Sequence, residues 1–158
     1  MSGSVIETMA DLLYTTEILR LAASLTEPHA LEREDGVAEL RSPTCGSRVR
    51  TGVTVDAEGR VVALSQQVHA CAFGQASATL VERGAIGLGT AEVGQAIDAM
   101  DAWLAGSDHE PQWPGIQALA PARSRTARHG AILLPFRTLA AALAAAAARS
   151  SGRDPPAP

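Results

Sequence analysis

The strongest constraint on the fold comes from an alternating segment, RVRTGVTVDAEGRVVALSQQV, at residues 48–68. β-Branched residues occupy every second position of its first half: Val49, Thr51, Val53 and Val55. The sequence DAEG then supplies a turn. Apolar residues of one parity mark the returning half: Val62, Leu64 and Val68. This alternation predicts a β-hairpin with one buried face, and the preceding VAELRS predicts a short strand that Pro43 ends.

Helical patterns surround the predicted strands. Apolar residues recur at helical spacing in four segments: 8–25, 72–83, 91–105 and 131–148. Thr90 is the expected cap of the third segment, with Glu92 in its first turn, and Pro135 must lie in the first turn or two of the last. Strands grouped in sequence and flanked by helices predict an α+β domain, in which a small antiparallel three-stranded sheet packs against several helices.

A chain of 158 residues is suited to one compact domain. We expect residues 1–11 to form an N-terminal extension and residues 12–149 to form the domain. The polar sequence SSGRDPPAP predicts a disordered tail over residues 150–158.

Charge and hydropathy exclude several classes of function. The net charge is −4 and the basic residues, all arginines, are dispersed, which argues against nucleic-acid binding. The N-terminus lacks the pattern of a signal peptide, and no continuous apolar run reaches the ~18 residues that would span a membrane. Two cysteines without a C-x-x-C pair suit a reducing, cytoplasmic setting, in which they are free thiols, metal ligands or catalytic groups. Neither a nucleophile elbow nor a phosphate-binding loop is present, so we do not expect a conventional enzyme.

Three residues stand at boundaries between predicted elements and have metal-binding side chains. Cys45 lies in the turn SPTCGS, Cys71 lies at the start of a predicted helix, and His129 precedes the last helix in ARHG. The N–H groups and dipole of a helix N-terminus favour a thiolate. Together the three side chains could converge on a metal ion. The alternatives remain open at this point: buried inert thiols for the cysteines, and a cap or solvated side chain for the histidine.

The cysteine segments also resemble a known family. SPTCGSRVRTGVTVDAEGRVVAL resembles a P-x-C-G-D segment followed by a hairpin, and VHACAFGQASATLV resembles a G-C-x-x-x-x-A-S-A-S segment. Both are typical of the iron–sulfur scaffold family that includes IscU, SufU and the N-terminal part of NifU. LYTTEILRLAA resembles its opening tyrosine-containing helix, and the longer DAWLAGSDHEPQWPGIQAL is similar to the SufU branch. The resemblance implies a SufE/NifU-like fold over about residues 12–145.

The resemblance also implies a set of ligand positions. The first two family cysteines match Cys45 and Cys71, and a histidine before the third cysteine matches His129. The family's aspartate position is Ser47 and its third cysteine position is Gly130. Two of the four main ligand positions are therefore changed. The implied site is Cys45, Cys71 and His129, with a fourth ligand from water, a partner's thiol or a small molecule.

Three functions are compatible with this reduced ligand set. The first is a scaffold or sulfur-relay protein for iron–sulfur assembly, which carries a transient cluster and works with a cysteine desulfurase and recipient apo-proteins. The second is a non-catalytic binding module of the same fold that docks a desulfurase or another assembly factor. The third is a structural zinc site completed by an outside ligand. If the protein is a non-catalytic binding module, we expect it to have no cofactor.

Overall fold

The computed structural model describes residues 15–43 and 46–152. Their elements, in chain order, are α2 (Thr16–Ala23), β1 (Gly36–Arg41), β2 (Arg48–Val55), β3 (Val61–His69), α3 (Ala72–Gly84), α4 (Thr90–Leu104), the 3-10 helices η1 (Ile116–Ala122) and η2 (Thr126–Arg128), and α5 (His129–Gly152). The strands form one antiparallel sheet in the order β1-β2-β3. This confirms the predicted α+β fold with a three-stranded sheet.

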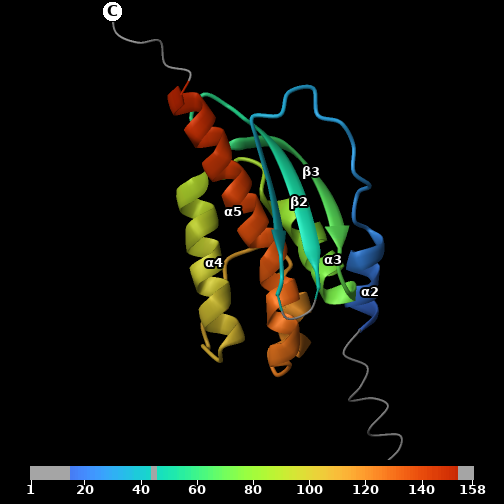
Figure 1. The fold of residues 1–158 in the computed structure, drawn as a ribbon. Helices are drawn as coiled ribbons and strands as arrows, with labels where there is room; N and C mark the ends of the chain where they lie inside the picture. The colour runs from blue at the N-terminus through green and yellow to red at the C-terminus, as the bar shows by residue number, and fades with distance from the viewer. Residues whose placement is uncertain (1–14, 44–45, 153–158) are drawn as a thin grey trace, which may run out of the picture.

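Helices α3 and α5 form the layer that covers the sheet. α5 lies against β1 and β2, and α3 lies against β3 and α5 (Figure 1). α4 packs on α5, and α2 packs on α3. The core between these layers is mainly aliphatic, and its largest fully buried side chains include Phe73, Phe136, Ile18, Leu80, Met100 and Ile132. The packing of α3 on α5 therefore determines where Cys71 and His129, at the starts of these two helices, lie relative to each other.

A register shift in the hairpin corrects one sequence prediction. Thr54 pairs with Ala63 but Val55 pairs with Val61, so β3 carries one extra residue, Val62. A bulge of this kind turns the side chain on one side of it to the opposite face. Val61 is fully buried whereas Val62 is 49% exposed, so the prediction that Val62 faces the core was wrong. Leu64, beyond the bulge, is buried as predicted.

Two helix starts differ from their predictions because of capping. The backbone of Thr15 is extended and its hydroxyl accepts the N–H of Ile18 at 3.1 Å, so one continuous helix over 8–25 is wrong. In α4 the cap is Gly89, not Thr90, which is already helical. The Glu92 carboxylate accepts the Gly89 N–H at 3.1 Å, so the side chain that caps this helix is that of Glu92 and not that of Thr90.

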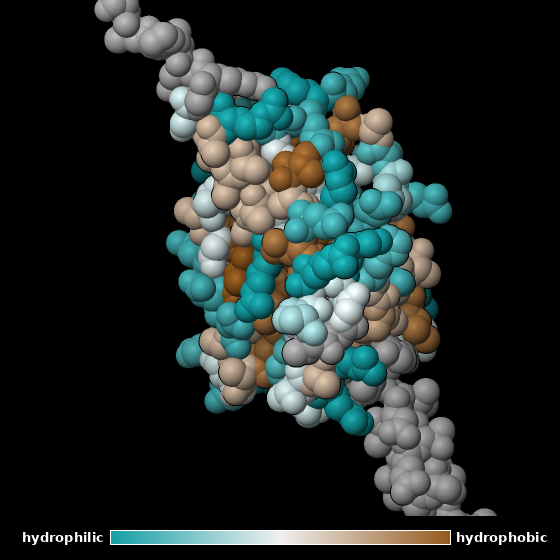
Figure 2. Space-filling model, in the orientation of Figure 1, coloured by the Kyte–Doolittle hydropathy of each residue, from teal (hydrophilic) through white to brown (hydrophobic). Residues whose placement is uncertain are grey.

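α5 is longer at both ends than the predicted 131–148, and it includes residues 150–152 that we had placed in the tail. By length and composition the stretch Thr126–Ser151 is apolar enough to cross a membrane, but 61% of its most apolar window is buried inside the protein. It is therefore the core helix of this domain. Figure 2 shows pale brown, weakly apolar side chains among hydrophilic ones where the upper part of α5 reaches the surface. The predicted extension over 1–11 and residues 153–158 of the tail lie outside the described residues.

Candidate functional site

Cys45 lies outside the described residues, and the described residues on either side of it lie at one end of the sheet. The Ser42 N–H donates to the Ser47 carbonyl at 2.8 Å, and the Gly46 N–H donates to the Ser42 carbonyl at 3.2 Å. Arg41 and Arg48 are paired across β1 and β2. Ser42 is therefore hydrogen-bonded to Gly46 and Ser47 at the end of the sheet where β2 begins.

The same end of the sheet leads to Cys71. Arg48, the first residue of β2, pairs with His69, the last residue of β3. Cys71 follows two residues later and caps α3. Ser47 and Cys71 thus flank one cross-strand pair, and the start of α5 lies at this end of the molecule as well (Figure 1).

Cys71 is a half-buried N-cap residue with an extended backbone (φ −67°, ψ 175°). Its carbonyl accepts the Gln75 N–H at 3.0 Å, but its side chain makes no capping hydrogen bond. It forms no disulfide with a described residue. Cys71 therefore stands at the N-terminus of α3, where the first-turn N–H groups have no helical partners. The predicted position of Cys71 at a helix start is confirmed, whereas its role as a ligand stays a prediction.

His129 begins α5, and its imidazole orientation is determined by two backbone carbonyls. Nε2 lies 3.1 Å from the Ala122 oxygen and 3.0 Å from the Arg123 oxygen. A carbonyl oxygen only accepts hydrogen bonds, so Nε2 carries the proton and donates it. In the neutral ring Nδ1 then keeps the lone pair. Metal-binding histidines characteristically donate their other ring N–H to a carbonyl or carboxylate, and the His129 ring has this arrangement.

The first turns of α3 and α5 touch. A methyl group built on Gly74 would lie 3.4 Å from the Ala131 carbonyl oxygen. One turn further along, the Ser77 hydroxyl donates to the Ile132 carbonyl at 2.5 Å. The helices that begin at Cys71 and His129 are therefore in direct contact close to their N-termini.

The described residues do not by themselves form a metal site. Within 15–43 and 46–152, no three His, Cys, Asp or Glu side chains are grouped so that they could hold a metal ion. If Cys71 and His129 are ligands, as predicted, they would provide one sulfur and one nitrogen donor, a combination that suits zinc or iron. Ser47 is 5% exposed at the start of β2, and Gly130 is half-buried in the first turn of α5. A three-donor site requires Cys45.

Comparison with solved structures decides the family. A crystal structure described as a nitrogen-fixing NifU-like protein (N-terminal) from Brucella abortus is 32% identical with a TM-score of 0.79, and the match covers 89% of this chain and 98% of that chain. The chain belongs to the NifU-like family. No family model and no curated protein matches it.

Two further structures share the NifU-like fold at lower identity. One is described as a putative iron–sulfur cluster assembly scaffold protein for the SUF system from Fervidobacterium islandicum AW-1. It is 22% identical with a TM-score of 0.74, and the match covers 84% of this chain and 97% of that one. The other is a hypothetical protein, 20% identical with a TM-score of 0.62, for which the match covers 81% of this chain and 96% of that one. Closeness to the SufU branch stays a prediction.

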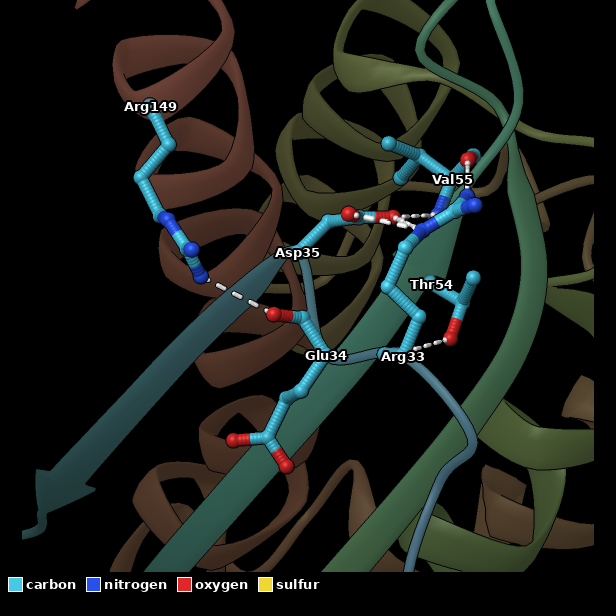
Figure 3. A network of polar contacts seen from close by, with 6 residues as sticks. All are labelled: Arg33, Glu34, Asp35, Thr54, Val55 and Arg149. Carbon is cyan, nitrogen blue, oxygen red and sulfur yellow. Dashed lines mark hydrogen bonds and ion pairs between the residues drawn. The ribbon is translucent and has the colours of Figure 1, made fainter. Parts of the chain in front are cut away.

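A polar network that the sequence patterns do not predict lies at the opposite end of this NifU-like domain (Figure 3). Asp35, which is largely buried, accepts the Val55 N–H at 2.9 Å and the Arg33 Nε–H at 3.0 Å. Arg33 also donates to the Val55 carbonyl at 2.8 Å, and Arg149 of α5 donates to the Glu34 carbonyl at 2.9 Å. The network attaches the chain before β1 to the end of β2 and to α5. The only indication of this network in the sequence is a charged residue just before a predicted strand.

Two exposed carboxylates near the β2–β3 turn have lowered pKa values. The Gly89 N–H and then the Arg60 guanidinium lower the pKa of Glu92, whose Oε1 lies 2.6 Å from Arg60 Nη1. The Arg60 backbone N–H lowers the pKa of Asp56. The Arg60–Glu92 pair holds the β2–β3 turn against the start of α4, whereas Asp56 accepts N–H groups within the turn, and we assign both carboxylates a structural role.

Proposed function

We propose that this NifU-like protein is a scaffold or sulfur-relay protein for iron–sulfur assembly, with Cys45, Cys71 and His129 as its ligands. The observation that carries the proposal is the meeting of the α3 and α5 N-termini, which start at Cys71 and His129. The partners would be a cysteine desulfurase and recipient apo-proteins in the cytoplasm. The similarity to a structure described as a putative scaffold of the SUF system supports this function.

The residues would act as follows. The thiols of Cys71 and Cys45 would lose their protons on binding iron or zinc. His129 would bind through Nδ1, because Nε2 donates its proton to the Ala122 and Arg123 carbonyls. A fourth position is left for an exchangeable ligand, such as a donor's sulfur. An incomplete protein ligand set suits a cluster that is cargo, since it must leave again.

Anaerobic loading with ferrous iron and sulfide, followed by iron analysis and absorbance, tests the proposal. We expect Cys45→Ser and Cys71→Ser each to lose at least about tenfold in metal affinity. His129→Gln keeps an amide N–H for the carbonyls but has no imidazole Nδ1, so it should fold and still bind weakly. His109→Gln, at an exposed histidine in the loop after α4, is the control and should bind as the wild type does. Unchanged loading of both cysteine variants would contradict the proposal.

A non-catalytic docking module is the second candidate. It is favoured by Ser47 and Gly130 at two positions where the family resemblance implies ligands. Pull-down with a cysteine desulfurase separates the two candidates. The docking module is supported if the Cys45→Ser plus Cys71→Ser double variant still binds the desulfurase and the wild type takes up no metal. One equivalent of zinc retained after exhaustive dialysis would instead indicate a structural zinc site.

A further inference from the structure

We infer that Ser77 is a positioning residue that sets His129 relative to Cys71 through its hydrogen bond to the Ile132 carbonyl. The inference rests on the proposed function, since it assigns a role in the same site. The hydroxyl of Ser77 is bonded to neither Cys71 nor His129. It acts on the turn of α5 that carries His129.

Ser77 joins the two helices that begin at the candidate ligands. Its side chain is completely buried, and its hydroxyl donates at 2.5 Å to Ile132, which is 55 residues away in sequence. Gly74, one turn before Ser77 on the same face of α3, lies against Ala131. A fully buried hydroxyl with a single short bond to a carbonyl holds that carbonyl in a defined position.

The first turn of α5 needs such an external contact because of Pro135. Proline has no N–H, so the Ala131 carbonyl, four residues earlier, lacks its usual helical donor. The turn that includes His129 is therefore joined to the rest of α5 by one backbone hydrogen bond fewer than in a regular helix. The Ser77 bond is made to Ile132, the residue next to that gap.

Two other buried hydroxyls provide matched controls. Thr79, two residues after Ser77 in α3, donates to the Leu21 carbonyl of α2 at 2.7 Å. Thr138 donates to the Leu134 carbonyl within α5, also at 2.7 Å. The hydroxyls of Ser77, Thr79 and Thr138 are all fully buried and bound to a backbone carbonyl. Those of Thr79 and Thr138, unlike that of Ser77, do not connect α3 to α5. Thr79→Val and Thr138→Val remove a hydroxyl with little change of shape, as Ser77→Ala does.

Titration of the anaerobic full chain with Co(II) is the main test. We expect Ser77→Ala to bind cobalt about 10–100-fold more weakly and with shifted d–d bands, since residues that orient a ligand have effects of this size. Thr79→Val and Thr138→Val should stay within about twofold of the wild type even where they lose as much stability in urea. Ser77→Thr, which keeps a hydroxyl, should recover the wild-type spectrum. Equal affinity and spectra for Ser77→Ala and wild type would overturn the inference.

A double variant tests the route of the effect. If Ser77 acts through His129, Ser77→Ala should change cobalt affinity by less than about twofold in a His129→Gln background. A full additional loss in that background would show that Ser77 acts on something other than His129, and would overturn the inference.

The metal-free protein gives a readout that is independent of the proposed function. In wild type the ¹⁵N shifts of the His129 ring should report one tautomer, protonated at Nε2, because of the Ala122 and Arg123 carbonyls. Ser77→Ala should produce a mixture of tautomers and faster amide exchange in the first turn of α5, whereas Thr79→Val should not. Failure of the wild type to bind any metal removes the proposed function. An unchanged His129 ring in Ser77→Ala removes the positioning role.

Discussion

Gly36 of β1 lies directly against the backbone of Ala142 in α5. A methyl group added to Gly36 would lie 2.1 Å from the Ala142 carbonyl oxygen and 2.6 Å from the Ala146 amide nitrogen. Both are backbone atoms of the core helix, so they cannot move aside as a flexible side chain can. Glycine at this position lets α5 approach the sheet closely. This close approach helps to determine where the start of α5 lies.

Gly36→Ala should therefore destabilise the fold. We expect a loss of about 1–3 kcal/mol in the free energy of unfolding, the usual effect of overpacking, measured by urea denaturation. Gly94→Ala in α4 is the matched control, because nothing lies within 4 Å of its added methyl group. That variant should gain about 0.5–1 kcal/mol from helix propensity. Equal stability of the two variants would show that α5 does not lie this close to β1.

The network around Asp35 should also contribute to stability. Asp35→Ala removes the acceptor of the Val55 N–H and of the Arg33 guanidinium, and we expect a loss of about 1–3 kcal/mol. Asp101→Ala removes an exposed carboxylate at 3.4 Å from Arg137 and should change stability by less than about 1 kcal/mol. Chemical denaturation of both variants checks the difference, and a larger effect at Asp101 would count against the network.

Glu92 should make stability depend on pH. Because folding lowers its pKa, its ionised form stabilises the native state above the ordinary glutamate pKa, and this contribution is lost as the pH falls through the lower, folded-state value. The difference in stability between wild type and Glu92→Gln should therefore be constant near neutral pH and shrink in acid. Unfolding curves measured from neutral to acidic pH test this. A flat difference for Glu92→Gln would contradict the assignment.

Gly130→Cys should strengthen the candidate metal site. It places a thiol in the first turn of α5, where the family resemblance implies a third cysteine. We expect tighter Co(II) binding and stronger sulfur-to-cobalt charge-transfer absorption than in the wild type. Ser124→Cys, at an exposed position before η2, is the control and should change neither. Identical spectra for Gly130→Cys and wild type would place the metal elsewhere.

Local chemistry made much of the fold predictable. The alternation in residues 48–68 and the DAEG turn require a hairpin, and the start of α3 at Cys71 follows from the change of period there. Boundaries that depend on one side chain were less predictable. Thr90 and Gly89 are both acceptable caps, and the choice between them depends on the Glu92 carboxylate. Val62 was misplaced because a bulge leaves no mark in a binary pattern of apolar and polar residues.

Periodicity and helix-breaking residues act over a few positions, so the sequence is enough to predict the element types and to put Cys71 and His129 at element boundaries. The meeting of those boundaries is visible only in the folded chain. That outcome depends on contacts between residues far apart in the chain: Gly36 against Ala142, Gly74 against Ala131 and Ser77 with Ile132. The orientation of the His129 ring comes from a more local contact, since the two carbonyls that accept its proton belong to the preceding 3-10 helix and its C-cap.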